Sequence, residues 1–497
     1  MIFYVYSHRK KLEHHMRKLL LYCLLAMMTA CISADKLPVL RVSFPGSFKK
    51  DMDYIHGNMS LTDENGHVVE LPAKFKTRGA TALNYSMKPS FNMKLRTEDN
   101  VEIDSTLLGL RSCSSWILDA MAIDQICMRN RVCFDVWNAF SKLPYPTSYG
   151  GRNGIIGKFV EVYINDKYTG IYCLNDRVNR KLLDLKKVKS GETGDTIRGG
   201  LYKHGTTDYG DQSTPGFFCD YTVYVPEWHD AWELTYPEEL ACEAAWEPLV
   251  NYYKSKKSYA YVSKNFFEDN LVDYALFIAA FSISDNWGNK NSYFSVRNMR
   301  KDDDKAWFVV TPWDLDTSLG GSYNGSKYGG NYTSWGVADV FKSASPPFST
   351  CLSQASFKNR LKQRWIEARE GALAIDSVAD RLYKYCDLFY RTRAWQRQRT
   401  WMSTLKYKPK HCDDLRSEVN LVVQWYQNRF AEMDEYFGVT ATGINDATNP
   451  QSLKLDLDLK PVRDRSMVNG LYDLQGRKIK NPVKGHLYIK NGKKILY

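Results

Sequence analysis

The first third of the chain consists of short runs in which apolar and polar residues alternate. From Val39 to about Leu110 these runs are broken by Gly, Asn and Asp, which is typical of antiparallel β structure. One run ends at a bend formed by Arg78 and Gly79, and a second strand is predicted from Pro89 to Arg96. The pattern therefore predicts an antiparallel sheet at the start of the protein.

Two further segments of this part differ in periodicity. Residues 157–178 alternate on both sides of a polar turn, which predicts a β-hairpin. Residues 115–140 place apolar side chains three and four positions apart, which predicts a helix. Taken alone, Arg129 and Asn130 would then be a feature of the C-terminal end of that helix.

Amphipathic segments of helical period dominate the rest of the chain. Two strand-like runs, within residues 284–298 and 306–321, interrupt them and predict a second hairpin. Strands gathered at one end and helices at the other favour an α+β fold over an alternating α/β fold. The predicted helices cover residues 237–257, 265–284, 355–372, 374–390 and 412–436.

Composition shifts along the chain predict its domain organisation. Residues 35–438 form one large domain, β-rich to about residue 180 and mainly helical from about residue 236. Residues 187–235 are rich in Gly, Asp, Thr and Tyr with little periodicity, so we expect a long insertion there. Residues 439–468 are predicted to be a linker. Short strands between Gly, Asn and Pro turns then predict a small β unit at residues 469–497.

The N-terminal segment has the order of residues found in a secretory signal peptide. Residues 16–34 begin with basic residues, continue with an apolar core and end with small residues, so Met16 is the expected start and residues 1–34 are the leader. The apolar run from Leu19 to about Ala30 is shorter than the roughly 20 residues of a membrane span. We therefore expect a secreted or surface protein without a transmembrane span. Lipoprotein anchoring at Cys31 is the less favoured alternative.

The composition leaves the predicted fold unchanged and excludes one class of partner. The chain has 44% hydrophobic and 25% charged residues, an ordinary globular balance. Its net charge of +12 comes from 68 basic and 56 acidic residues, and removing the leader leaves 63 − 55 = +8. Acidic residues are mixed in throughout, without the concentrated basic face that nucleic-acid binding requires. We therefore predict no nucleic-acid partner.

Several familiar site types are also excluded by their missing motifs. Nine cysteines follow the leader without any C-x-x-C pair, which argues against a zinc site and leaves one or two disulfides as an alternative. The sequence has no G-x-S-x-G, H-E-x-x-H, G-x-x-x-x-G-K-[ST] or G-x-G-x-x-G motif. Serine hydrolase, zinc protease and P-loop chemistry therefore have no support.

Acids and amides flank the second predicted hairpin. Asp285 and Asn291 precede its first strand, in SDNWGNKNSYF, and Asp314 and Asp316 follow its second strand, in PWDLDTSLGG. A hairpin brings both flanks to one end. Carboxylate and amide oxygens are ligands for Mg²⁺ or Mn²⁺, particularly when phosphate oxygens complete the shell. In phosphoryl transfer a further aspartate orients the attacking hydroxyl.

Each of these residues has a simpler interpretation by itself. Asp314 and Asp316 could cap the turn after a buried strand, and Asp285 could be a loop residue after a helix. The order of catalytic Asp, metal-binding Asn, hairpin and metal-binding Asp is also the order in protein kinases, although neither H-R-D-x-x-x-x-N nor D-F-G occurs literally. The hypothesis depends on the combination.

Five blocks between Lys74 and Gly321 together resemble the spore coat protein H (CotH) kinase-like family of atypical secreted kinases. They match, in order, the family's R-G-N-S-type loop with its following strand, its R-N helix, its Y-x-N hairpin and its two active-site motifs. The blocks are KTRGATALNYSMKPSFNMKL, LDAMAIDQICMRNRV, VEVYINDKYTGIYCLNDRV, SDNWGNKNSYF and PWDLDTSLGG.

The resemblance implies an atypical protein-kinase-like bilobal fold with an antiparallel β N-lobe and a mainly helical C-lobe. It implies ATP and Mg²⁺ or Mn²⁺ as cofactors and transfer of the γ-phosphate to Ser or Thr hydroxyls of a protein. Asp285 would be the catalytic aspartate, and the metal would be held by Asn291, Asp314 and Asp316. The nucleotide would be contacted by Arg78, Gly79, Lys88 as the phosphate-binding lysine or else Lys94, and Asp176, which stands where the family usually has Glu.

The C-terminal residues resemble a second pattern. YDLQGRKI followed by KGHLYIKNGKK is similar to the sorting tail of exported proteins of the Bacteroidetes, which an outer-membrane secretion machinery reads. That resemblance implies delivery to the cell surface or beyond it. The alternative to a kinase is a noncatalytic surface protein, a pseudokinase, that uses the same fold for binding or adhesion.

Overall fold

The structure is a computed structural model, and its contacts divide the chain into two units, Met1–Val439 and Thr440–Tyr497. Each unit is described by itself. The predicted leader lies outside the described residues. The structure describes residues 36–49, 53–79, 88–191, 194–204, 232–238, 243–283, 286, 291–299, 307–333, 335–402 and 414–439, with strands at 471–472, 487–490 and 493–496.

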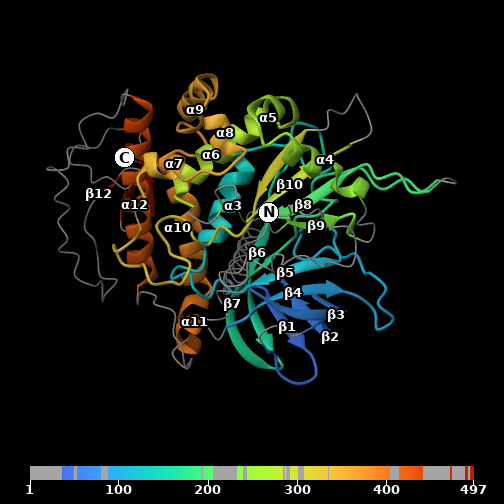
Figure 1. Cartoon of the computed structure of the whole chain (residues 1–497). Coiled ribbons are helices and arrows are strands. Elements are labelled where there is room, and N and C mark those ends of the chain that lie inside the picture. Colours follow the sequence, from blue (N-terminus) through green and yellow to red (C-terminus); the bar gives the residue numbers. More distant parts are fainter. Residues whose placement is uncertain are drawn as a thin grey trace, which may run out of the picture. The chain divides into compact units, whose positions relative to one another are not determined.

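The first unit begins with a closed barrel of seven strands (Figure 1). Neighbouring strands are antiparallel except β1 and β6, whose parallel pairing closes the barrel. The predicted antiparallel region and the hairpin at 157–178 are thus confirmed. The strands, in their order around the barrel, are β1 (Val39–Ser43), β2 (Ile55–Thr62), β3 (Val68–Arg78), β4 (Ser90–Leu95), β5 (Ser115–Asp119), β7 (Lys167–Asn175) and β6 (Gly157–Ile164).

Alternation along β4 shows why these runs form a barrel wall. Phe91, Met93 and Leu95 are buried in the apolar core, whereas Asn92 and Lys94 are half-buried on the other face. Successive side chains of a strand point to opposite faces, so one face fills the barrel and the other stays polar. That polar outer face is where the candidate site lies.

The helix predicted over residues 115–140 is wrong in its first half. Residues 115–119 form β5 of the barrel, and helix α3 (Arg129–Phe140) begins ten residues after the end of that strand. The carboxylate of Asp124 accepts from the backbone amide of Arg129 at 2.8 Å and so supports the helix start. Arg129 and Asn130 therefore open a helix instead of ending one.

A second, four-stranded antiparallel sheet contains the predicted second hairpin, β10 (Ser292–Val296) and β11 (Phe308–Pro312). Its other strands, β8 (Gly200–His204) and β9 (Trp232–Tyr236), come from the two ends of the segment expected to be an insertion. The expected insertion therefore contributes two strands of this sheet. Most side chains of β8 are buried, so the strand lacks the alternation that marks a half-exposed strand.

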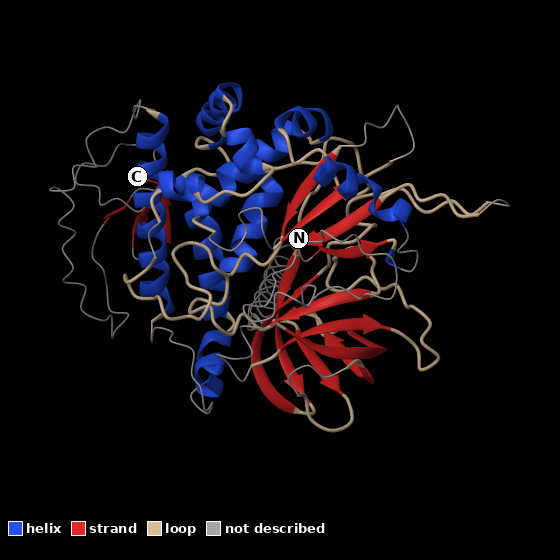
Figure 2. Ribbon diagram, viewed as in Figure 1, coloured by secondary structure: helices blue, strands red, loops and turns tan. Residues whose placement is uncertain are grey.

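The helices gather on one side of the strands, which agrees with the α+β class (Figure 2). Helix α6 (Glu268–Phe281) is buried all round from Asn270 onward and forms the centre of the helical part. The remaining helices are α4 (Glu243–Lys254), α5 (Tyr259–Asn265), α7 (Val337–Lys342), α8 (Phe348–Leu352), α9 (Ala355–Ala368), α10 (Ile375–Arg391), α11 (Ala394–Met402) and α12 (Leu415–Phe437).

The second unit contains the short strands predicted for the tail. Strands β12 (Leu471–Tyr472), β13 (Leu487–Lys490) and β14 (Lys493–Leu496) form an antiparallel sheet in that order. Among all the described residues, no helix combines the length and apolar character that crossing a membrane requires. Six of the described cysteines are free thiols, and all six are buried.

Candidate functional site

The described residues that flank the β10–β11 hairpin, Asn291 and Trp313, lie next to one another. The backbone amide of Trp313 donates to the carbonyl of Asn291 at 2.9 Å, one step beyond the last paired residues of the hairpin. Asn291 and Asp314 both have positive φ, 54° and 56°, a conformation that Asn and Asp tolerate better than most residues. The chain therefore turns away from both strands at the same place. Asp285 lies outside the described residues.

Asn286 ties this end of the hairpin to the helical part. Its side-chain amide donates to the carbonyls of Asn291 and Trp313, and its own carbonyl accepts from the hydroxyl of Tyr274 in α6 at 2.7 Å. The side chain is fully buried, yet its Oδ1 accepts no hydrogen bond from any described residue. Buried polar atoms are normally paired, so this oxygen has capacity for a further polar group.

A narrow crevice joins Asp314 to the arginine of the β3 bend. It lies between the outer face of the barrel, the first turn of α3 and the end of β11, and holds about 10 Å³, room for about one water. Two of the predicted site residues, Arg78 and Asp314, line it, and they come from opposite walls. The complete lining is Arg78, Ile117, Asp119, Asn130, Phe134, Ile155, Asn175, Trp313 and Asp314.

A chain of hydrogen bonds crosses the wall of this crevice. The side-chain amide of Asn130 donates to Asp119 at 2.7 Å, and its Oδ1 accepts from the backbone amide of Leu315 at 3.2 Å. Leu315 stands between Asp314 and Asp316. Asp119 was not predicted to belong to the site, and only the family's R-N helix connected Asn130 with it. Each is separated from the hairpin by more than 150 positions in the sequence.

Positive side chains gather beside Asp314. The Arg78 guanidinium lies over the ring of Trp313 at 5.2 Å, and Trp313 meets Tyr293 edge-on at 5.7 Å. Burial lowers the pKa of Lys203 in β8, and Arg78 and Arg177 lower it further, against the effect of Glu233, which pairs with Lys203 at 3.5 Å. The three cations are thus close enough to act on one another, and we call them the basic cluster.

The basic cluster contains two residues that the sequence did not indicate. Arg177 lies two residues beyond the end of β7, and Lys203 lies in the segment expected to be an insertion. Burial raises the pKa of Tyr293, which also senses Arg177, Arg78 and Asp314, so the basic cluster and the carboxylate share one environment. Arginine and lysine beside a carboxylate form a donor set suited to phosphate groups with a divalent cation.

Comparison with known proteins assigns the family. Residues 75–433, well over half of the chain, match the family model described as CotH kinase protein. The chain belongs to the CotH kinase family. No curated protein matches it.

The matched segment of this CotH kinase runs from β3 to the last turns of α12. It contains the barrel wall that carries Arg78, the hairpin and the crevice. The leader and the C-terminal sheet lie outside it. Family membership therefore applies to the part of the chain that carries the candidate site.

A divalent cation fits the oxygen donors at the hairpin end only together with further ligands. Asp314 is exposed at the crevice, and Asn286 has an unpaired buried oxygen. Asp316 is half-buried and does not line the crevice. Within the described ranges no group of three or more His, Cys, Asp or Glu side chains could hold a metal. Mg²⁺ usually takes one or two carboxylates and completes its shell with phosphate oxygens and water, and this site matches that pattern.

Lys88 does not lie in the crevice. Its side chain is 1% exposed, and its ammonium donates to the carbonyls of Ala120, at 2.9 Å, and Ile171, with the ring of Tyr172 at 4.4 Å. Burial lowers its pKa to about 8. The expected phosphate-binding role is therefore corrected for this structure: the ammonium faces the interior, where two carbonyls bind it.

The second choice, Lys94, lies nearer to the basic cluster. Its ammonium stands over the ring of Tyr54 at 4.6 Å on the outer face of β4. Burial lowers its pKa, and Arg177 lowers it further. Lys94 is therefore electrostatically coupled to the basic cluster, although it does not line the crevice. Gly79 is exposed at the end of β3, with φ of 95°.

Asp176 does not lie at the crevice, where the resemblance would place it as a nucleotide contact. It is fully buried, and its Oδ2 accepts from Arg111 at 2.8 Å and Arg152 at 3.1 Å. Its Oδ1 accepts from the backbone amide of Ile156 at 2.8 Å. Both oxygens are thus used by protein donors, so Asp176 joins the barrel to the segment before β6 instead of facing the crevice.

Removing the buried charge of Lys88 should change how stability depends on pH. With a pKa of about 8 when folded and an ordinary value of 10.5, Lys88 binds its proton less tightly in the folded state. Between those two pH values the unfolded chain holds more protons, so the wild type gains about 3 kcal/mol of stability as pH rises. Lys88→Met should lack this gain. Urea unfolding of both proteins at pH 7 and 10.5 measures the difference, and parallel profiles would contradict the buried charge.

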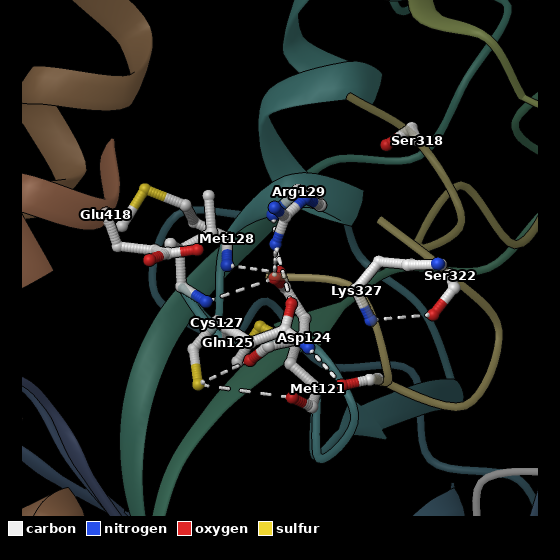
Figure 3. Close-up of polar contacts among 12 residues, drawn as sticks. Met121, Asp124, Gln125, Cys127, Met128, Arg129, Ser318, Ser322, Lys327 and Glu418 are labelled. Atoms are coloured by element: carbon white, nitrogen blue, oxygen red, sulfur yellow. Dashed lines mark hydrogen bonds and ion pairs between the residues drawn. The ribbon is translucent and has the colours of Figure 1, made fainter. Parts of the chain in front are cut away.

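A buried ionic network fixes the loop that follows the hairpin, residues 318–333 (Figure 3). Arg129 donates to Asp124 at 2.5 Å, beside Gln125, whose amide donates to the carbonyl of Gly325 at 2.7 Å. Glu418 of α12 accepts from the amide of Gly329 at 2.8 Å and from the hydroxyl of Tyr332. The first turn of α3 and the first turn of α12 therefore hold this loop from two sides.

Close packing at Gly321 adds to this network. A Cβ there would lie 3.1 Å from Nε of Arg129, tighter than side chains normally pack. Arg129 and Glu418 are each 1% exposed. The glycine after the active-site motif thus leaves room for a buried arginine, which explains why the loop needs glycine at that point.

Proposed function

We propose that this CotH kinase is an exported atypical protein kinase that transfers the γ-phosphate of ATP to Ser or Thr hydroxyls of a protein substrate. The reaction would depend on Mg²⁺ or Mn²⁺. The observation that carries the proposal is the crevice that both Arg78 of the barrel and Asp314 after the hairpin line. A bilobal kinase-like arrangement, with the nucleotide between barrel and helices, is part of the proposal.

Each residue of the site has a role in this reaction. Asp285 would accept the proton of the attacking hydroxyl. Asp314, Asn291 and Asp316 would hold the metal, which when bound neutralises charge on the terminal phosphates. The basic cluster would bind and orient the phosphate groups on the barrel side, with Lys94 at its edge. Lys88, already bound to two carbonyls, would support the barrel wall.

The second candidate function is noncatalytic binding of a protein or glycan. The observation that favours it is the loop after the hairpin, where Tyr323 is 52% exposed and Trp335, just beyond the loop, 47%. Exposed aromatic side chains are frequent at recognition surfaces. A noncatalytic binding protein would not need the acidic residues at the hairpin end. Substituting those residues therefore distinguishes the two candidate functions.

Export and delivery complete the proposal. The leader at residues 1–34 would direct the chain out of the cytoplasm, with Cys31 as an alternative lipid anchor. The tail at residues 469–497 would be read by an outer-membrane secretion machinery. Deleting the tail should leave the protein folded but retained in the cell, which fractionation of the producing cells would measure.

Thermal unfolding with ATP and Mn²⁺ tests the proposed binding. A ligand at about 100 times its dissociation constant adds roughly 2.7 kcal/mol, so the midpoint should rise clearly. Arg78→Ala should reduce this rise, because it removes a cation from the crevice. Arg41→Ala, in β1, is the control, because its guanidinium lies over Tyr163, away from the crevice lining. An unchanged midpoint at saturating Mn²⁺ and ATP would favour the binding protein.

A further inference from the structure

We propose that Asn130 is a positioning residue that fixes the metal-binding segment Asp314–Asp316 through its hydrogen bonds to Asp119 and Leu315. This inference rests on the proposed function. Asn130 stands in the first turn of α3, between the last residue of β5 and the loop after β11. Its two hydrogen bonds, 2.7 Å to Asp119 and 3.2 Å to Leu315, connect the barrel wall to the hairpin end.

The polarity of this connection requires an amide at position 130. Leu315 is fully buried, so its backbone N–H needs an acceptor inside the protein, and Oδ1 of Asn130 supplies it. Asp119 is an acceptor, so only the Nδ2 side of Asn130 can face it. Its other oxygen accepts from the amide of Met121 at 3.0 Å, which holds the carboxylate in place. The donor and acceptor sides of Asn130 are thereby fixed.

The same helix also holds the carbonyl of Leu315. Ser318 donates from Oγ to that carbonyl at 2.6 Å, and Cys133 of α3 donates to the same Oγ at 3.1 Å. Asn130 and Cys133 are three residues apart and so lie on one face of α3. Both backbone groups of Leu315 are therefore held by this face. Asp314, with its left-handed φ of 56°, adjoins this doubly fixed residue.

This arrangement predicts an effect on metal use. A carboxylate that binds a metal needs its backbone held in place, and loss of such outer contacts typically costs about 10–100-fold in metal affinity or activity. Loss of the Asn130 bonds would let the segment around Leu315 shift. The Mn²⁺ concentration for half-maximal phosphoryl transfer should therefore rise, while the KM for the protein acceptor should stay unchanged.

Exchanging the two partners provides the test. Asn130→Asp sets two carboxylates against one another. Asp119→Asn leaves one oxygen for two donors, the amide of Met121 and Nδ2 of Asn130, so one of these donors faces an N–H group. The double variant D119N/N130D restores one donor facing one acceptor and keeps an acceptor for Leu315. Each single variant should raise the half-activating Mn²⁺ concentration about 10–100-fold. The double variant should return to within about threefold of wild type.

Asn138→Ala is the matched control. Asn138 lies two turns further along α3, is also half-buried, and donates to a carbonyl, that of Ile155 at 2.9 Å. It makes no hydrogen bond to Leu315 or Asp119, so its loss should leave the Mn²⁺ requirement unchanged. If the double variant folds but needs as much Mn²⁺ as the single variants, the proposed pairing is overturned.

A second readout separates this inference from the proposed kinase activity. Hydrogen exchange at the Leu315 amide should accelerate in Asn130→Asp and return to the wild-type rate in the double variant. If wild type transfers no phosphate, the kinase proposal fails, and the inference is judged on this exchange alone. Unaltered protection of Leu315 in both single variants would overturn it.

Discussion

Phosphoryl transfer should fall about 10³-fold or more when Asp314 is replaced by Asn, while the protein stays folded. The carboxylate at the crevice would be a metal ligand, and loss of metal-based charge stabilisation costs several kcal/mol at the transition state. Because Asp314 is exposed and Asn has nearly the same shape as Asp, we expect the variant to fold. Transfer of radiolabelled γ-phosphate from ATP to a serine-rich acceptor such as casein measures the effect, over a range of Mn²⁺ concentrations.

Two comparison variants make this result specific. Asp285→Asn should lose about 10²–10⁴-fold in transfer but keep nucleotide binding, because it removes the proton acceptor and no metal ligand. Asp380→Asn, at an exposed position of α10, should behave as wild type. Equal activity of wild type and Asp314→Asn would argue for the noncatalytic alternative.

Replacing Arg129 with Met should lower the free energy of unfolding by about 3–5 kcal/mol, because it leaves the buried carboxylate of Asp124 without its partner. Glu418, which is buried beside Tyr332, would also lose a nearby cation. Urea unfolding followed by tryptophan fluorescence measures this loss. The loop at residues 318–333 should in addition become more sensitive to limited proteolysis.

Arg360→Met is the matched control for the buried network. Arg360 pairs with Asp269 at 3.2 Å and with Glu367 at 3.5 Å, but all three side chains are at least one third exposed. Exposed pairs of this kind contribute about 0–1 kcal/mol, so this variant should change stability little. Similar losses in both arginine variants would contradict a special role for Arg129.

The sequence predicted those elements whose faces differ in exposure. Strand β4 alternates between buried and half-buried side chains, and the long helices each have one apolar face, so simple periodicity identified them. The β10–β11 hairpin and the meeting of Asn291 with Asp314 were also predicted, because a hairpin necessarily brings its flanks together. The α+β class followed from these elements.

Periodicity missed one short buried strand and misplaced the start of one helix. Strand β8 is almost completely buried, so its alternation is lost. Residues 115–140 contain a strand, a loop and a helix. Apolar residues recur at every third or fourth position through all three, so the pattern predicted a single helix. The turn at Asp124, which supports the start of α3, was visible only once the structure showed its contact with the helix amides.

The site was predictable only where its residues are close in sequence or belong to the family motifs. Arg78 and Asp314 were predicted and share the crevice. Asp119 and Asn130 reach the crevice through tertiary folding, and Arg177 and Lys203 lie near Arg78 without lining it. Lys88 shows the converse: its place in the family pattern implied a phosphate contact, but its ammonium donates to buried carbonyls.

Crystals grown with Mn²⁺ and a non-hydrolysable ATP analogue provide the most direct test, through the anomalous scattering of manganese. The account predicts a manganese peak bound to the Asp314 carboxylate, with the terminal phosphates on the side of Arg78. A peak on a different surface, or a nucleotide bound away from the crevice, would contradict it.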